Sequence, residues 1–184
     1  KKIKASQRMI LPHRKTKISK LAEDIANEFS DRNLTLLNEI AKFEDVPLYF
    51  DNYENAFDGM LLYDTDNSDF HIHINIDNGN RQDSKRGRFT LAHELGHFFL
   101  DEHRLGLKYG LLEPHASFHN INQKSLIEEE ADYFASCLLM PAAKLKNHSS
   151  EYRRRTGRRD FSFDTIQDLS ETFQASNFAQ RSVV

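Results

Sequence analysis

The 184-residue sequence has almost no cysteine and no long apolar run, and each shortage excludes a class of protein. Its only cysteine, Cys137, cannot form an internal disulfide, which is typical of a protein from a reducing compartment. No apolar run approaches the roughly 18 residues that a membrane-spanning helix needs. The basic N-terminal segment is not followed by the apolar stretch of a signal peptide. We therefore expect a cytoplasmic protein with no membrane partner.

Further absences concern the fold. The chain has no phosphate-binding glycine loop, no internal repeat and no low-complexity tract. Its expected elements do not alternate as β-α-β units do, which argues against a parallel nucleotide-binding sheet. A chain of this length is expected to form one domain with a small appendage.

Basic residues are concentrated in two segments, although the formal net charge is −3. Residues 1–20 contain eight Lys/Arg and no acid, and residues 144–159 contain seven Lys/Arg and one Glu. The remaining sequence carries 10 basic and 27 acidic residues. We expect these basic segments to be solvated and mobile; direct binding to nucleic acid is the alternative that we do not favour.

The hydrophobic pattern predicts helices, then short strands, then helices again. The expected helices lie at 18–29, 34–44, 88–103 and 125–140, with two more within 163–184, and the strand-like runs lie at 46–50, 59–64 and 69–77. In the last run, Phe70, Ile72, Ile74 and Ile76 are expected on one face and His71, His73 and Asn75 on the other. This order predicts an α+β fold with a small antiparallel or mixed sheet packed on the helix at 88–103, and a helical C-terminal tail.

The helix at 88–103 contains the pattern H-E-x-x-H. His93 and His97 are one helical turn apart, so both imidazoles can reach one metal ion. Glu94 is rotated by about 100° from His93, which suits a general base for a metal-activated water better than a third ligand. A chance pair of histidines on an amphipathic helix is the alternative. This helix is apolar nearly all round, however, and buried histidines and acids need partners.

The third metal ligand is not obvious from this segment. His103 lies ten residues after His93, where the metzincin pattern places a third histidine. That pattern needs a glycine at its eighth position so that the chain can turn, but this position holds Leu100. We therefore predict that the helix continues through Leu100. His103 would then face away from the site and cap the last turn.

A carboxylate from the helix at 125–140 is the better candidate. Acids at a helix N-terminus are favoured by the helix dipole alone, but Asp132 lies inside an otherwise apolar stretch. Because Asp132 is four residues after Glu128, the two share a face. Glu128 can bind the ion while Asp132 accepts the outer N–H of a ligating histidine. Glu130 is the alternative ligand. Glu129 has no acid four residues later that could support a ligating histidine.

Together, "RFTLAHELGHFF" and "EEEADYFASCLLMP" resemble the ImmA/IrrE family of zincin metallopeptidases, of the HExxH plus ExxAD type. The matching residues are His93, Glu94 and His97 in the first motif, and Glu128, Ala131 and Asp132 in the second. The resemblance extends over residues 18–184. It implies a zincin-like core with one zinc ion per chain, Glu94 as the catalytic base and Asp132 supporting a ligand.

The resemblance also implies a regulatory role. The best-known members of this family act on helix-turn-helix repressors in stress responses and mobile elements. We accordingly expect a basic N-terminal arm (1–17), a metallopeptidase domain (18–143), and a basic linker with a helix-turn-helix-like tail (144–184). The tail is expected to cap the fold, bind the repressor or bind DNA.

Smaller features support narrower hypotheses. The strand at 69–77 is expected to offer a free edge to an extended substrate. His71 and His73 could form a metal pair, although simple exposure to water is the favoured interpretation. Tyr109, together with His115 and His119, lies in a loop that could supply a group to stabilise an oxyanion. Cys137 is interpreted as core packing.

The sequence therefore supports two candidate functions. The first is a zinc endopeptidase in which Glu94 handles the proton of the attacking water. The second is a non-catalytic regulator that binds DNA or a partner and keeps only a structural zinc site. The complete set of ligands and base favours the enzyme.

Overall fold

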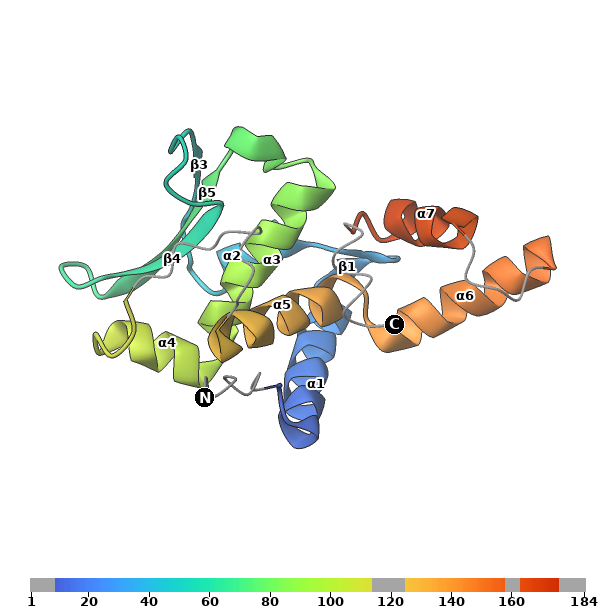
Figure 1. The fold of residues 1–184 in the computed structure, drawn as a ribbon, viewed down its shortest axis with the longest axis horizontal. Helices are drawn as coiled ribbons and strands as arrows, with labels where there is room; N and C mark the ends of the chain where they lie inside the picture. The colour runs from blue at the N-terminus through green and yellow to red at the C-terminus, as the bar shows by residue number, and fades with distance from the viewer. Residues whose placement is uncertain (1–8, 114–124, 158–162, 176–184) are drawn as a thin grey trace, which may run out of the picture.

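The structure is a computed structural model that describes residues 9–113, 125–157 and 163–175. These ranges contain seven α-helices, one 3-10 turn and two small sheets, and they confirm the predicted α+β class (Figure 1). The elements are α1 (Pro12–Glu28), β1 (Ser30–Asp31), β2 (Leu34–Thr35), α2 (Leu37–Phe43), β3 (Leu48–Asp51), β4 (Gly59–Asp64), β5 (Asp69–Asn75), η1 (Asp77–Gly79), α3 (Lys85–Phe99), α4 (Asp101–Lys108), α5 (Leu126–Leu139), α6 (Ala142–Thr156) and α7 (Phe163–Thr172). Within the described ranges, no helix combines the length and the apolarity that a membrane crossing requires.

The larger sheet is mixed and has β5 at its centre, in the order β3-β5-β4. β3 runs parallel to β5, whereas β4 runs antiparallel to it and pairs Gly59 with Ile74. The hypothesis that the strand at 69–77 offers a free edge is therefore wrong, because a neighbour occupies each of its edges. The outer strand β4 contacts α3 at Gly59, which lies against Thr90 and Glu94.

The predicted alternation along β5 holds as far as Ile74, which is fully buried, and then fails. Asn75 was expected to face outward but has no exposed surface. Its Nδ2 donates to the carbonyl oxygens of Glu54 and Phe57, at 2.7 and 2.8 Å. Ile76 lies beyond the end of the strand and is 39% exposed instead of buried. The side chain of Asn75 is thus buried because it satisfies loop carbonyls, a need that strand periodicity does not reveal.

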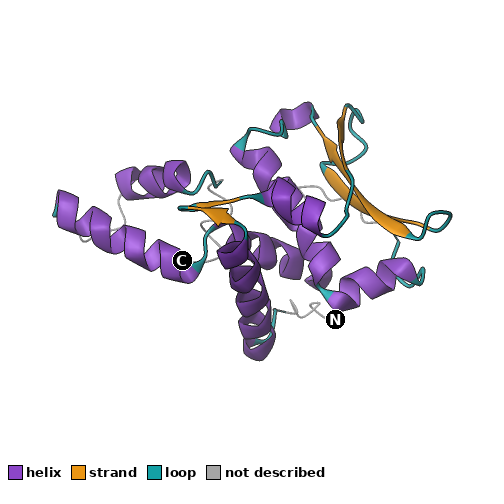
Figure 2. Cartoon of the chain, turned by 180° about the vertical axis from the view of Figure 1, so that it is seen from behind, coloured by secondary structure: helices purple, strands orange, loops and turns teal. Residues whose placement is uncertain are grey.

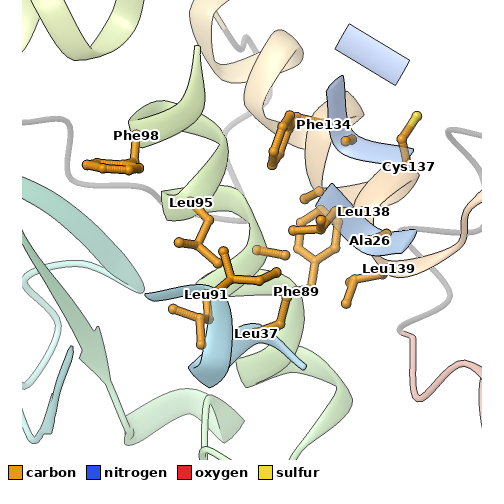
Figure 3. Packing of buried hydrophobic residues seen from close by; sticks show 14 of the residues in the cluster. Ala26, Leu37, Phe89, Leu91, Leu95, Phe98, Phe134, Cys137, Leu138 and Leu139 are labelled. Carbon is orange, nitrogen blue, oxygen red and sulfur yellow. The ribbon is translucent and has the colours of Figure 1, made fainter. Parts of the chain in front are cut away.

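Within the part of the chain that the structure describes, the buried apolar residues form a hydrophobic core around α3. Side chains of α3 and α5, with Ala26 of α1 and Leu37 of α2, form one buried cluster (Figure 3). On one side of α3, the ring of Phe98 meets Phe70 of the sheet edge-on, with centroids 5.6 Å apart. On the other side, Phe99 stacks on Phe134 of α5 at 6.0 Å. α3 is therefore held between the sheet and α5. Cys137 belongs to the same cluster.

The N-terminal part of the chain is more structured than its charge pattern suggested. α1 begins at Pro12 and not near residue 18, so residues 12–17 of the expected arm are helical. Proline suits the first turn of a helix, because the N–H that it lacks has no partner there. The helix expected at 34–44 is also shorter, since Leu34 and Thr35 form β2, which pairs with β1.

The predicted basic linker at 144–159 is also wrong in form, because residues 142–156 make the continuous helix α6. Arg153, Arg154 and Arg155 occupy its last turn, where cations are favoured by the helix dipole. Asp168 of α7 contacts His148 and Arg155 of α6, so the two helices are linked. Figure 2 shows this pair at the opposite end of the molecule from the larger sheet. The second helix expected in the tail falls outside the described residues.

Candidate metal centre

Two histidines on α3 point at each other across one helical turn. Ser84 caps the N-terminus of this helix by accepting a hydrogen bond from the backbone N–H of Gly87. The Nε2 atoms of His93 and His97 lie 3.1 Å apart, and the two residues are only 2% and 3% exposed. As the H-E-x-x-H spacing predicted, both rings face one point beside the helix.

Glu128 on α5 completes this cluster, in which the three side chains each offer one ligand atom. Its Oε2 lies 3.3 Å from Nε2 of His93, and its Oε1 lies 3.3 Å from Nε2 of His97. The helices can approach this closely because Gly96 has no side chain. A Cβ at Gly96 would lie 3.2 Å from the carbonyl oxygen of Ala131. Contact between α3 and α5 thus unites residues that are separated by about thirty positions in the chain.

The distances fit a tetrahedral zinc site. Zinc binds imidazole nitrogen at about 2.0–2.1 Å, so neighbouring ligand atoms in a tetrahedron lie about 3.3–3.4 Å apart. The measured separations of 3.1 and 3.3 Å are close to this edge. Oε1 of Glu128 is buried and makes no hydrogen bond of good geometry to the described residues. A bound cation would satisfy this oxygen, and three protein ligands would leave the fourth position open.

Asp132 supports the first of the two histidines. Its Oδ1 lies 2.9 Å from Nδ1 of His93, on the side of the ring opposite Nε2. The carboxylate can accept the Nδ1–H and so hold Nε2 without a proton, facing the cluster. This is the arrangement that the four-residue spacing of Glu128 and Asp132 predicted.

His103 makes a contact that the sequence did not reveal. The prediction that the helix continues through Leu100 is wrong: Leu100 is extended, with φ −80° and ψ 106°, and α4 starts at Asp101. The chain therefore turns, and Nδ1 of His103 comes to lie 3.1 Å from Nδ1 of His97. His103 is 2% exposed and does not cap α3. It also does not belong to the three-residue cluster, so it contacts a candidate ligand without being one.

The surroundings of the cluster shift the pKa values of its members in opposite directions. Burial alone lowers the pKa of His93, but contacts with Asp132 and Glu128 outweigh burial and raise it to about 10. Burial lowers the pKa of His97 to about 4, although Glu128 opposes this shift. Burial also acts to raise the pKa of Glu128, yet His93 and His97 hold it well below its usual range. In the metal-free cluster, a proton on His93 therefore balances the ionised Glu128, and a bound cation would take the place of this proton.

Glu94 lies beside the cluster and is completely buried. A Cβ at Gly59 of β4 would lie 2.7 Å from Oε1 of Glu94 and 2.6 Å from Cγ2 of Thr90. Glycine is therefore the one residue type at position 59 that leaves room for the carboxylate of Glu94. This position suits the general base that the H-E-x-x-H pattern predicts.

The other candidates are arranged differently. Glu130, the alternative ligand, has its Oε2 3.2 Å from Nε2 of His103 and 2.6 Å from Arg14. Nδ1 of His73 lies 2.8 Å from the hydroxyl of Tyr53, and the ring centroids of His71 and His73 are 6.4 Å apart. Tyr109 is 68% exposed, and His115 and His119 lie outside the described residues. A second group of possible ligands, at the β4–β5 hairpin, is partly exposed and consists of Asp64, Asp69 and His71.

Comparison with known proteins adds independent evidence. The Peptidase_M78 family model, described as the IrrE N-terminal-like domain, matches residues 61–179. The matched range contains both motif helices and the larger part of the sheet. A search of curated proteins gave no match.

Proposed function

The chain belongs to the Peptidase_M78 family of IrrE N-terminal-like domains and is thus a protein of metallopeptidase type; from this premise we propose that it is a zinc-dependent endopeptidase. His93, His97 and Glu128 are the proposed ligands of one zinc ion. The observation that carries the proposal is the convergence of their three ligand atoms, with edges of 3.1–3.3 Å, beside the buried carboxylate of Glu94. Three ligands with one open position are typical of catalytic and not of structural zinc sites.

A zinc ion bound here supplies the Lewis acidity that lowers the pKa of water and polarises a peptide carbonyl. Glu94 takes the proton from the attacking water and later delivers it to the leaving amine. Asp132 keeps a proton on Nδ1 of His93, so that Nε2 of this ring remains a neutral donor to the metal. Glu128 is the most exposed of the three proposed ligands, since 15% of its side chain is accessible, against 2% and 3% for the two histidines.

The proposed substrate is a helix-turn-helix transcriptional repressor, cleaved at few sites in stress or mobile-element regulation. Resemblance to the ImmA/IrrE family supports this substrate class. The β4 strand supports an extended binding mode, because it is an edge strand within the described sheet and lies beside Glu94 at Gly59. An extended peptide segment can add to such an edge through backbone hydrogen bonds.

The test compares the wild type with Glu94→Gln, and with Glu129→Gln as a control on α5. Zinc content is measured first, and cleavage is then measured on a mixed-sequence fluorogenic peptide library and on the helix-turn-helix repressor encoded nearest to this chain. We expect both variants to keep one zinc ion. Glu94→Gln should lose cleavage by on the order of 10²-fold or more, because base catalysis is removed.

The two assays separate the two parts of the proposal. If Glu94→Gln cleaves the library as fast as the wild type, Glu94 is not the base and the proposed mechanism fails. If the wild type cleaves the library but not the repressor, only the substrate assignment fails. If the wild type binds zinc and cleaves neither, the zinc site is structural and the non-catalytic alternative holds.

A further inference from the structure

A chain of four polar side chains extends from His97 toward the surface. Nδ1 of His97 lies 3.1 Å from Nδ1 of His103, and Nε2 of His103 lies 3.2 Å from Oε2 of Glu130. The same Oε2 accepts a hydrogen bond from Nη2 of Arg14 at 2.6 Å. Arg14 also donates from both terminal nitrogens to Glu102, at 3.0 Å each. These contacts lie behind His97, on the side away from the metal cluster.

We propose that His103 is a positioning residue for the candidate zinc ligand His97, and that Arg14 of α1 anchors it through Glu130. The inference rests on the zinc site of the proposed function but not on peptidase activity. It gives His97 a supporting group that corresponds to Asp132 behind His93. It also gives α1 a direct part in building the metal centre.

Metal binding by His97 fixes the direction of each hydrogen bond in this series of side chains. His97 can bind a metal through Nε2 only if that atom carries no proton, so its proton is on Nδ1. Nδ1 of His97 then donates to Nδ1 of His103, which must accept. His103 therefore carries its proton on Nε2 and donates to Glu130. Glu130 can only accept, and Arg14 can only donate, so a single arrangement satisfies every contact.

Burial makes Arg14 necessary to this arrangement. His103 and Glu130 are 2% and 8% exposed, and a buried carboxylate without a cation is costly. Arg14 supplies that cation from a position 116 residues away in the chain. The fork of its guanidinium is held in place by the two-point contact with Glu102. His103 is therefore held against His97 only when α1, α4 and α5 are packed together.

The first experiment compares His103→Leu with His103→Asn. Leucine removes the acceptor, whereas Oδ1 of asparagine takes the place of Nδ1 and keeps a hydrogen bond to His97. Both variants lose the contact with Glu130. If His103 acted by packing alone, zinc affinity would therefore fall equally in both. Zinc affinity is measured by competition with a chromophoric chelator. We expect binding about 10–100-fold weaker in His103→Leu and within a few-fold of the wild type in His103→Asn.

The second experiment tests the anchor. Arg14→Gln is compared with Lys17→Ala, which removes an exposed cation from the same helix. Imidazole ¹⁵N NMR of the metal-free proteins reports which nitrogen of His97 carries the proton. The wild type and Lys17→Ala should show the Nδ1–H form, and Arg14→Gln should show a mixture with weaker zinc binding. Circular dichroism and thermal unfolding establish that each variant is folded.

The outcomes distinguish failure of this inference from failure of the proposed function on which it rests. If the wild type fails to bind zinc, the proposed function itself falls. If the wild type binds zinc and folded His103→Leu binds it equally well, the positioning role is refuted and the zinc site stands. Equal losses in His103→Leu and His103→Asn would likewise refute it, since they would reflect packing alone.

Discussion

Asp132 and His93 form the most direct support of the candidate metal centre: Oδ1 of Asp132 lies 2.9 Å from Nδ1 of His93, and both residues are buried. They belong to different helices and are 39 positions apart. The contact orients a ring whose other nitrogen faces His97 and Glu128. It links the second motif of the sequence to the first through a hydrogen bond as well as through a shared ligand set.

Removing this contact should weaken metal binding without abolishing it. In Asp132→Ala, His93 loses the acceptor that fixes its tautomer, and we expect about 10–100-fold weaker zinc binding by chelator competition. Asp132→Asn should lose less, because the amide oxygen can still accept the Nδ1–H. Glu129→Ala serves as the control on the same helix. Equal affinity in Asp132→Ala and in the control would contradict the supporting role of Asp132.

Zinc should stabilise the folded chain, and Glu128 should be needed for this effect. A ligand at 100 times its dissociation constant stabilises a protein by about 2.7 kcal/mol. For a domain of this size, such a gain raises the melting temperature by roughly 5–10 °C. Differential scanning calorimetry with zinc and with EDTA should show this difference in the wild type and in Glu129→Gln. In Glu128→Gln the difference should shrink to less than half, and an unchanged shift would exclude Glu128 as a ligand.

Gly59 should be intolerant of a side chain, because its added Cβ would lie 2.6 Å from Cγ2 of Thr90 and 2.7 Å from Oε1 of Glu94. We expect Gly59→Ala to lower the free energy of unfolding by about 1–3 kcal/mol, as overpacking does, and to displace Glu94. Cleavage should therefore fall more than zinc affinity. Adding Thr90→Ser removes Cγ2 and should restore part of the stability but little of the cleavage. Full recovery of cleavage in the double variant would show that the clash with Glu94 has no consequence.

Cys137 should be unreactive in the folded protein. It is 3% exposed, and burial raises the pKa of its thiol to about 12, although Tyr133 opposes the shift. The thiolate is the reactive form, and at pH 8 the raised pKa leaves the thiol almost wholly protonated. Iodoacetamide should modify the folded chain at least about 10²-fold more slowly than the chain unfolded in guanidinium chloride. The rate in the folded chain should rise as the pH is raised toward 12, and similar rates in both states at pH 8 would contradict the buried position.

Much of the candidate centre could be predicted from local sequence, because helical periodicity decides which side chains share a face. His93 and His97 are four residues apart, as are Glu128 and Asp132, and each pair lies on one face of its helix. The apolar residues around the first pair predicted a buried helix, and α3 is indeed held between the sheet and α5. The α+β class and the positions of the strands followed from the change of hydrophobic period along the chain.

The remaining features depend on contacts between distant segments. Leu100 could have continued a helix, but its backbone is extended. The chain turns at this point, and His103 packs against His97. Arg14 appeared to belong to a solvated basic arm, yet it meets Glu130, 116 positions away. Sequence alone thus determined which residues could act together within one helix, because helix geometry is local. Only the tertiary structure decided what supports them, because burying polar groups is favourable only where packing brings their partners together.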